Sequence, residues 1–174
     1  MDDLVVAALQ KWPNVPACRG WLGLDARGDW YMRDERIQAA GAFPHPKGSR
    51  IEHDKLIDFI ARNYGVDADG AWFFQNGPQR VYVELEAAPW VWRLRTDGAQ
   101  PTITSHTGRA ARFESAWLDD ADRLFLATDL GLGIVHSMDM HEAAAAVEAG
   151  AWRPQAARFA QLPARFGYRL SPAS

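Results

Sequence analysis

Apolar and polar positions alternate with a period of two over much of this chain, which predicts β-strands. Residues 80–86 (RVYVELE) are the clearest case, because three aliphatic side chains alternate with Tyr82 and Glu84. The apolar runs elsewhere are shorter, but turn residues bound them in the same way. They predict further strands at residues 22–24, 30–32, 72–74 and 90–95, and in several runs after Pro101.

One long segment has a helical period instead. Residues 51–65 place Leu56, Ile60 and Tyr64 on one stripe, acidic residues gather in the first turn, and Gly65 is predicted to end the helix. The other non-strand segments are weaker. They predict helices at residues 1–12 and about 140–149, a loop at 39–49, and a short helix in the C-terminal tail.

The order of these elements predicts an α+β fold. We expect two small modules of mainly antiparallel sheet, the first with one packed helix, followed by a helical C-terminal tail. The predicted divisions are an N-terminal helix and linker (1–19), a first α+β module (20–98), a mostly β module ending in a helix (99–150) and the tail (151–174).

A short motif occurs twice, as DARGDWYM at residues 25–32 and as DADGAWFF at residues 67–74. Asp at the first position and Gly at the fourth predict a hairpin turn, because Asp accepts local backbone hydrogen bonds and Gly tolerates positive φ. A weaker third copy, without the glycine, lies within residues 117–129. An EF-hand loop is excluded, because its ligand positions and its glycine do not match.

Composition narrows the class of protein. The 174 residues carry a formal net charge of −3, which disfavours nucleic-acid binding, and no apolar run is long enough to predict a membrane-spanning helix. The single cysteine, Cys18, excludes an internal disulfide and fits a reducing compartment. The acidic start, MDDLVV, does not resemble a signal peptide. We therefore expect a cytoplasmic protein without a cofactor or bound metal.

The ordered segments LGLDARGDWYM, DKLIDFIARNYG and DADGAWFFQNGPQRVYVELEAAPWVWRL resemble an uncharacterised proteobacterial family of unknown function, DUF1285. The resemblance covers about residues 20–95, with weaker similarity to about residue 140. QNGPQRVYVEL departs from that family, which usually has a Thr-Pro-x-Glu-type segment before its strand. The resemblance implies two small α+β modules and at most a binding or signalling role. It supplies no catalytic residues.

The candidate ligand-binding residues follow from polar and aromatic clustering. TSHTGR groups polar side chains that could hold an anion, although a solvated turn explains the same residues. Trp90 and Trp92 share a strand face and form either an exposed aromatic patch or part of the core, a choice that also applies to the eight tryptophans generally. The full candidate set is Arg80, Trp90, Trp92, Ser105, His106, Thr107 and Arg109.

Catalytic and metal-binding patterns are weak. His136 and His141 are spaced i, i+5, which places them on different helix faces, so they and Asp139 do not predict a metal site. Cys18 has no local partner that would activate it as a nucleophile. Neither a G-x-S-x-G stretch nor a dinucleotide-binding fingerprint is present.

Two functions therefore stay open. The first is a module that binds a small molecule or a protein, with a sensing or signalling role. The second is a small hydrolase or transferase in which His106 meets Glu84, Asp129 or Asp139 only in the folded chain. The ligand or partner and the oligomeric state are not predicted.

Overall fold

The computed structural model describes residues 1–173, which form two compact units. Unit 1 contains Met1–Asp25, Asp29–Glu86 and the segment from Tyr168 onward, whereas unit 2 contains Ala26–Gly28 and Ala87–Gly167. Along the chain, the boundary between the two units follows Glu86, whereas the predicted boundary follows residue 98. The reason is that residues 90–97 pair with strands of unit 2.

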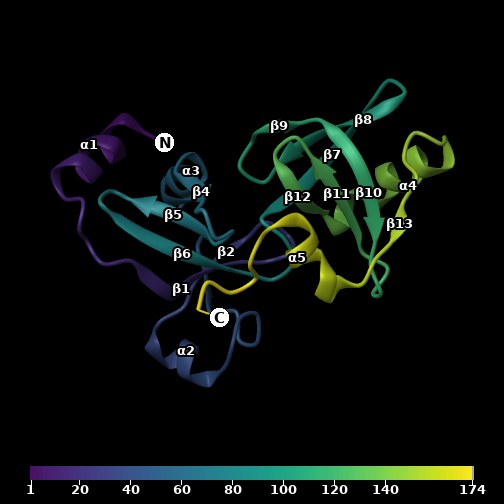
Figure 1. Ribbon diagram of the computed structural model, residues 1–174. Helices are drawn as coiled ribbons and strands as arrows, with labels where there is room; N and C mark the ends of the chain where they lie inside the picture. Colours follow the sequence, from purple (N-terminus) through teal and green to yellow (C-terminus); the bar gives the residue numbers. More distant parts are fainter. Residues whose placement is uncertain (174) are drawn as a thin grey trace. The chain divides into compact units, whose positions relative to one another are not determined.

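Unit 1 is built on a six-stranded sheet in the order β3-β2-β1-β6-β5-β4 (Figure 1). β1 and β6 run parallel, and the other neighbours are antiparallel. The elements are α1 (Asp3–Lys11), β1 (Cys18–Leu24), β2 (Trp30–Met32), α2 (Glu35–Ala40), β3 (Ser49–Arg50), α3 (Asp54–Arg62), β4 (Tyr64–Val66), β5 (Trp72–Asn76) and β6 (Gln79–Leu85).

Helix α3 is the predicted packed helix of the first module, but it is shorter than predicted. It ends at Arg62, because the Asn63 backbone N–H donates to Ile60 and its side-chain amide donates to Phe59. The following residues, Tyr64 and Gly65, belong to strand β4. The prediction that Gly65 ends the helix is therefore wrong. A capping asparagine ends it first.

Unit 2 is a seven-stranded sheet in the order β13-β10-β11-β12-β7-β8-β9, again mainly antiparallel. The β12–β7 and β10–β13 pairs are parallel. Its elements are β7 (Trp90–Asp97), β8 (Gln100–Ser105), β9 (Ala110–Ala111), β10 (Phe113–Leu118), β11 (Leu124–Thr128), β12 (Gly131–Val135), η1 (Ser137–Asp139), α4 (Met140–Glu148), β13 (Gln155–Ala156), η2 (Phe159–Gln161) and α5 (Leu162–Phe166). With both sheets and their helices, the fold class is α+β, as predicted.

The two repeated motifs form hairpin turns of one design. In the first, the Asp25 carboxylate accepts the backbone N–H of Asp29 at 2.9 Å, and in the second the Asp67 carboxylate accepts that of Ala71 at 3.0 Å. The glycine at the fourth position has a positive φ, 85° for Gly28 and 82° at the equivalent position of the second turn. This confirms the prediction of hairpin turns.

The weaker third copy closes in the same way. The Asp119 carboxylate accepts the backbone N–H of Arg123 at 2.8 Å, and Asp122 stands where the other turns have glycine, with a φ of 57°. Aspartate is one of the few non-glycine residues that adopt this left-handed conformation readily. The missing glycine therefore does not prevent the turn.

The chain returns to unit 1 after unit 2 is complete. The backbone N–H of Leu85, on β6, donates to the carbonyl of Leu170 at 2.8 Å, and that of Arg169 donates to Gly70 at 2.9 Å. Unit 1 is thus assembled from segments on both sides of unit 2 in the sequence.

Candidate functional site

The predicted ligand-binding residues fall into two separate units. Arg80 belongs to unit 1, where its guanidinium lies 3.9 Å from the centre of the Phe73 ring. The other six belong to unit 2. Of these, Trp90, His106 and Arg109 come together, with ring centroids 5.9 Å apart for the first two and the Arg109 guanidinium 5.7 Å from the Trp90 ring.

Trp90 and Trp92 are core residues. Their exposed fractions are 3% and 0%, their rings stack with centroids 6.0 Å apart, and each indole N–H donates to a backbone carbonyl, of Leu130 and Leu126 respectively. An exposed pair of indoles is therefore contradicted. Further along the same strand, Arg93, Arg95, Thr96 and Asp97 are exposed.

The polar stretch TSHTGR forms a fourth turn of the repeated design. The Ser105 hydroxyl replaces the aspartate carboxylate and accepts the backbone N–H groups of Thr107 at 3.2 Å and Arg109 at 3.1 Å. Gly108 again occupies the fourth position, with a φ of 86°. The His106 ring accepts the Val91 backbone N–H through Nδ1 at 3.2 Å. These polar groups therefore support a turn, which is the alternative explanation given for them above.

The acids considered for an enzyme have structural partners. Arg93 contacts both carboxylate oxygens of Asp139, at 2.7 and 3.2 Å, and lowers its pKa. The Arg112 backbone N–H donates to Asp129 at 2.7 Å, and Glu84 belongs to unit 1, where burial raises its pKa. Among residues 1–173, no three His, Cys, Asp or Glu side chains are grouped as metal ligands.

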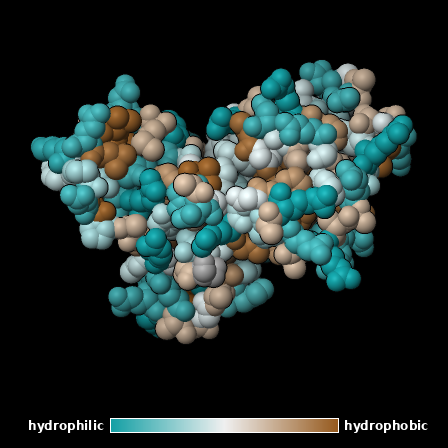
Figure 2. Space-filling view, in the orientation of Figure 1, coloured by the Kyte–Doolittle hydropathy of each residue, from teal (hydrophilic) through white to brown (hydrophobic). Residues whose placement is uncertain are grey.

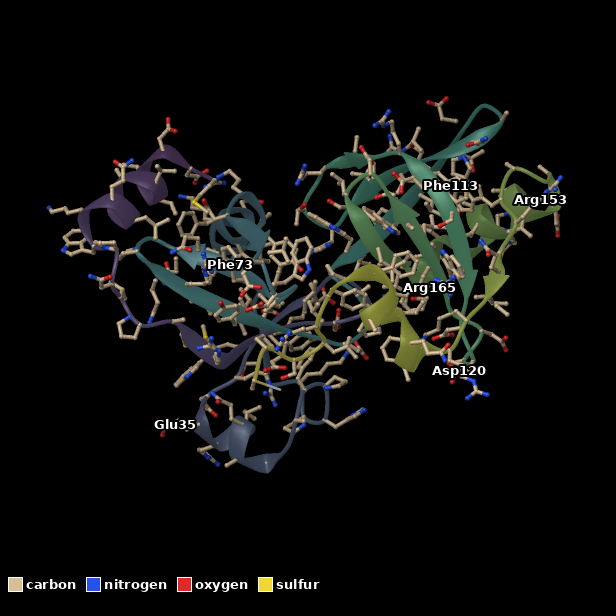
Figure 3. All side chains as sticks on the ribbon, in the orientation of Figure 1. Glu35, Phe73, Phe113, Asp120, Arg153 and Arg165 are labelled. Carbon is tan, nitrogen blue, oxygen red and sulfur yellow. The ribbon has the colours of Figure 1, made fainter. Side chains whose placement is uncertain are left out.

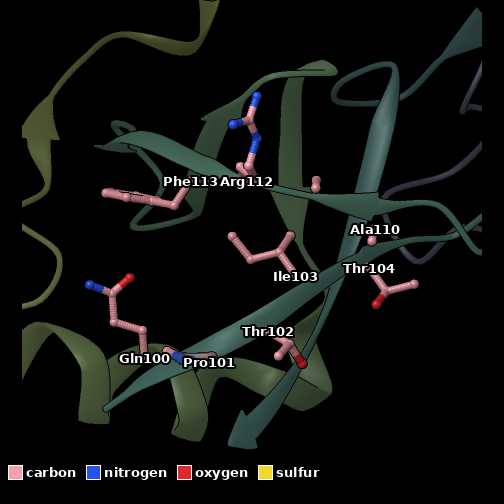
Figure 4. A pocket seen from close by; sticks show the side chains of 9 residues that line it. Gln100, Pro101, Thr102, Ile103, Thr104, Ala110, Arg112 and Phe113 are labelled. Carbon is pink, nitrogen blue, oxygen red and sulfur yellow. The ribbon is translucent and has the colours of Figure 1, made fainter. Parts of the chain in front are cut away.

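Unit 2 has a cavity of about 440 Å³ beside β8 (Figure 4). Figure 4 shows Gln100, Thr102 and Ile103 on β8 and Phe113 at the start of β10. The stretches of β8 and β10 that line this cavity carry features that oppose pairing with another strand. Pro101 lacks a backbone donor, and β10 is irregular between Phe113 and Ser115. The cavity therefore does not favour binding of an extended peptide.

Unit 1 contains a more apolar cavity, of about 220 Å³, between α3 and the sheet. Its deepest residues are Leu22, Ile60 and Phe74, which are at most 5% exposed, and its rim includes Trp21 and Met32 at 37% and 47%. The complete lining is Cys18, Trp21, Leu22, Met32, Ile51, Leu56, Ile60, Phe74, Asn76 and Val81. A concave apolar surface with few polar groups is the usual form of a small-molecule site.

The polar groups of this cavity are the Cys18 thiol and the Asn76 amide. Cys18 is free and half-buried, and burial raises the pKa of its thiol. The neutral thiol therefore predominates at neutral pH, so Cys18 acts as a weakly polar wall residue and not as an activated nucleophile. The residues that line this cavity include no His, Asp, Glu or Lys side chain.

The family profile described as "Protein of unknown function (DUF2946)" matches residues 1–173. The chain belongs to this family. Two solved structures are similar in fold. One is a DUF1285 family protein from Silicibacter pomeroyi DSS-3, with 15% identity, a TM-score of 0.50, and 82% of this chain and 83% of that chain covered. The second is a DUF1285 family protein from Shewanella baltica OS155, with 17% identity and a TM-score of 0.48. The match covers 71% of this chain and 90% of that chain.

These comparisons confirm the predicted resemblance to an uncharacterised family related to DUF1285. A comparison of this DUF2946 family member with curated proteins finds no match. No helix among residues 1–173 is long and apolar enough to cross a membrane. The description of the DUF2946 family assigns no activity, so function has to be inferred from the site.

No pattern in the sequence of this DUF2946 family member predicts the cavity directly. Leu56 and Ile60 were expected on the buried stripe of a helix, and Val81 on the apolar face of a strand, but these patterns predict packing and not the space left by it. Trp21 lies in the middle of β1 and Met32 at the end of β2, and neither belongs to a marked periodic pattern.

Proposed function

We propose that this protein is a ligand-binding module whose unit 1 cavity holds a small apolar group. The observation that carries the proposal is the apolar lining of the cavity, which combines buried Leu22 and Phe74 with a partly exposed rim. A ligand that covers this surface removes apolar area from water, which contributes about 25 cal/mol per Å².

The size of the cavity limits the ligand. A dry cavity of about 150 Å³ lined by aliphatic and aromatic side chains accommodates benzene, and this cavity measures about 220 Å³. It therefore suits one aromatic ring with a short substituent, or a short branched acyl chain. The Asn76 amide supplies a hydrogen-bonding group for a polar end.

A sensing role is favoured over catalysis. Helix α3 contributes Leu56 and Ile60 to the cavity, so a ligand adds contacts that stabilise this helix against the sheet. A cytoplasmic setting belongs to the same proposal and rests on the single, reduced cysteine. Fractionation of cells that produce the tagged protein tests that setting.

Binding is tested by titrating isotopically labelled protein with indole, ethylbenzene and 4-methylpentanoate while recording backbone amide spectra. At least one compound is expected to cause saturable shifts at α3 and β6. Val81→Phe fills the cavity and should abolish these shifts, whereas Val66→Phe, the same change at a 46% exposed position on β4, should leave them intact. The proposal fails if none of the three saturates, or if Val81→Phe binds as well as the unsubstituted chain.

A further inference from the structure

Two arginines lie over two aromatic rings on the face of the β5–β6 ladder that is opposite the apolar cavity. Phe73 and Tyr82 face each other across the ladder with ring centroids 6.2 Å apart. Arg80 lies 3.9 Å from the Phe73 ring centre and Arg19, on β1, lies 4.5 Å from that of Tyr82. Figure 3 labels Phe73 on β5. Alternation along the strands points the cavity residue Val81 the other way.

The aromatic pair is held in place by the second repeated turn. The Tyr82 hydroxyl donates to the Asp67 carboxylate at 2.9 Å, and the other oxygen of Asp67 accepts the backbone N–H groups of Asp69 and Ala71. Burial raises the pKa of Asp67, but these hydrogen bonds outweigh it and the pKa is lowered overall. The carboxylate is therefore charged at neutral pH, and its oxygens are used within the turn.

An irregularity in β1 accompanies the position of Arg19. The β1–β6 register shifts between Cys18 and Leu22, and Gly20 within this stretch has a φ of 85°. Irregularities of this kind redirect side chains and occur often beside functional sites. Here the exposed side chain of Arg19 lies over Tyr82.

The hydrogen-bond donors of both guanidiniums are unused among residues 1–173. Neither the Arg19 nor the Arg80 side chain makes a hydrogen bond or an ion pair in this part of the chain. Stacking on a ring fixes the guanidinium plane while its N–H groups stay available in the fork geometry that matches oxyanions. Two such groups on adjacent, rigid rings lose less conformational entropy on binding than free surface arginines.

We propose that Arg19 and Arg80 form a binding site for an oxyanion, namely the phosphate or carboxylate group of a small ligand. The inference is independent of the apolar cavity, because it uses different residues on the opposite face of the ladder. The Asp67 carboxylate limits the positive charge next to Arg80. Recognition therefore depends on paired hydrogen bonds more than on net charge.

The test follows the Nε–H resonances of the arginines in labelled protein during titration with inorganic phosphate and, separately, with citrate. The resonances of Arg19 and Arg80 are expected to shift together and to saturate. Preferential saturation by phosphate assigns a phosphate group, and preferential saturation by citrate assigns a carboxylate. Arg36, exposed on α2 and without a ring partner, serves as the reference resonance.

Arg19→Gln and Arg80→Gln should each weaken binding about tenfold or more, because each removes charge-assisted hydrogen bonds. Arg80→Lys keeps the charge but loses the fork and should also weaken binding, while Arg36→Gln should have no effect. Linear, non-saturating shifts with both anions would overturn the proposal. So would equal shifts at Arg36, or a single glutamine variant in which the resonance of the remaining arginine saturates at the same anion concentration as in the unsubstituted protein.

Discussion

The two units use the same kind of hairpin turn but fill their interiors differently. In unit 2, the stacked Trp90 and Trp92 occupy the sheet interior, and Gly133 on β12 has no side chain where the Trp92 indole lies. In unit 1, aliphatic and aromatic residues on α3 and the sheet leave a cavity of about 220 Å³. The large side chains of unit 2 thus pack in its sheet interior, whereas apolar side chains of unit 1 line the cavity that we propose binds a ligand.

This difference teaches where binding should be sought in such a protein. A tryptophan-rich sequence drew attention to Trp90 and Trp92, yet full burial makes them structural. The apolar surface of the proposed ligand cavity is formed instead by aliphatic residues such as Leu56 and Val81. Whether a side chain borders the cavity, more than its residue type, separates the two roles.

The largest expected effect tests how tightly the sheet interior of unit 2 is packed around Trp92. Trp92→Ala should destabilise the protein by about 3–5 kcal/mol, because it removes a buried indole and leaves a cavity. Trp12→Ala, at a 50% exposed position, is the matched control and should change stability by less than about 0.5 kcal/mol. Urea unfolding, combined with hydrogen exchange of β7 and β11 amides, measures both. Similar losses in the two variants would remove the distinction between packed and exposed tryptophans.

A smaller effect is expected from adding one methyl group to the same interior. In Gly133→Ala the new Cβ would overlap the Trp92 indole, so the variant should lose about 1–3 kcal/mol through overpacking. Gly77→Ala in unit 1 is the comparison variant, because its new Cβ would meet open space although the backbone φ is positive. Its loss of stability therefore measures backbone strain without steric overlap. Thermal unfolding measures the change. An unaltered Tm for Gly133→Ala would show that unit 2 has more space than its packing indicates.

The third prediction concerns the type of hairpin turn that occurs in both units. Asp122→Val places a β-branched residue at a φ of 57° and should cost about 1–2 kcal/mol, while Asp122→Gly restores the residue of the other turns and should be close to neutral. The same urea titration serves for both variants. A valine variant as stable as the glycine variant would contradict the requirement for a left-handed residue.

The smallest effect is a change in the pH dependence of stability that is confined to unit 2. The hydrogen bond from Arg93 lowers the pKa of Asp139 below its ordinary value, so its stabilising contribution is present above about pH 4. That contribution is lost as the pH falls through the lowered pKa. Asp139→Asn should therefore flatten the decline of unit 2 stability between about pH 5 and pH 2, as measured by hydrogen exchange. The pKa of Asp67 in unit 1 is also lowered, so the stability of unit 1 should keep its pH dependence in this variant.

Local patterns in the sequence predicted the local structure well. The Asp-x-x-Gly motifs located hairpin turns, and the stripe of Leu56 and Ile60 located α3, because these signals act over a few residues. The turn at Ser105 was only an alternative, since serine replaces the expected aspartate. The motif alone did not separate it from an anion site.

Long-range features were not predictable in the same way. The parallel pairing of β1 with β6 joins strands separated by more than fifty residues, and no local pattern specifies such a partner. The cavity depends on how side chains such as Phe74 and Ile60 fail to fill space between elements. The position of Arg19 over Tyr82 depends on the same pairing and on the irregularity in β1.

The return of the chain to unit 1 has a consequence for biosynthesis. Ribosomes make proteins from the N-terminus, so Ala87–Gly167 is synthesised before the segment that pairs with β6 through Leu170. All strands of unit 2 are therefore synthesised before the last segment of unit 1, which begins at Tyr168. Most of unit 1 is therefore synthesised before unit 2 but completed after it, and until then the Leu85 backbone N–H lacks its Leu170 acceptor.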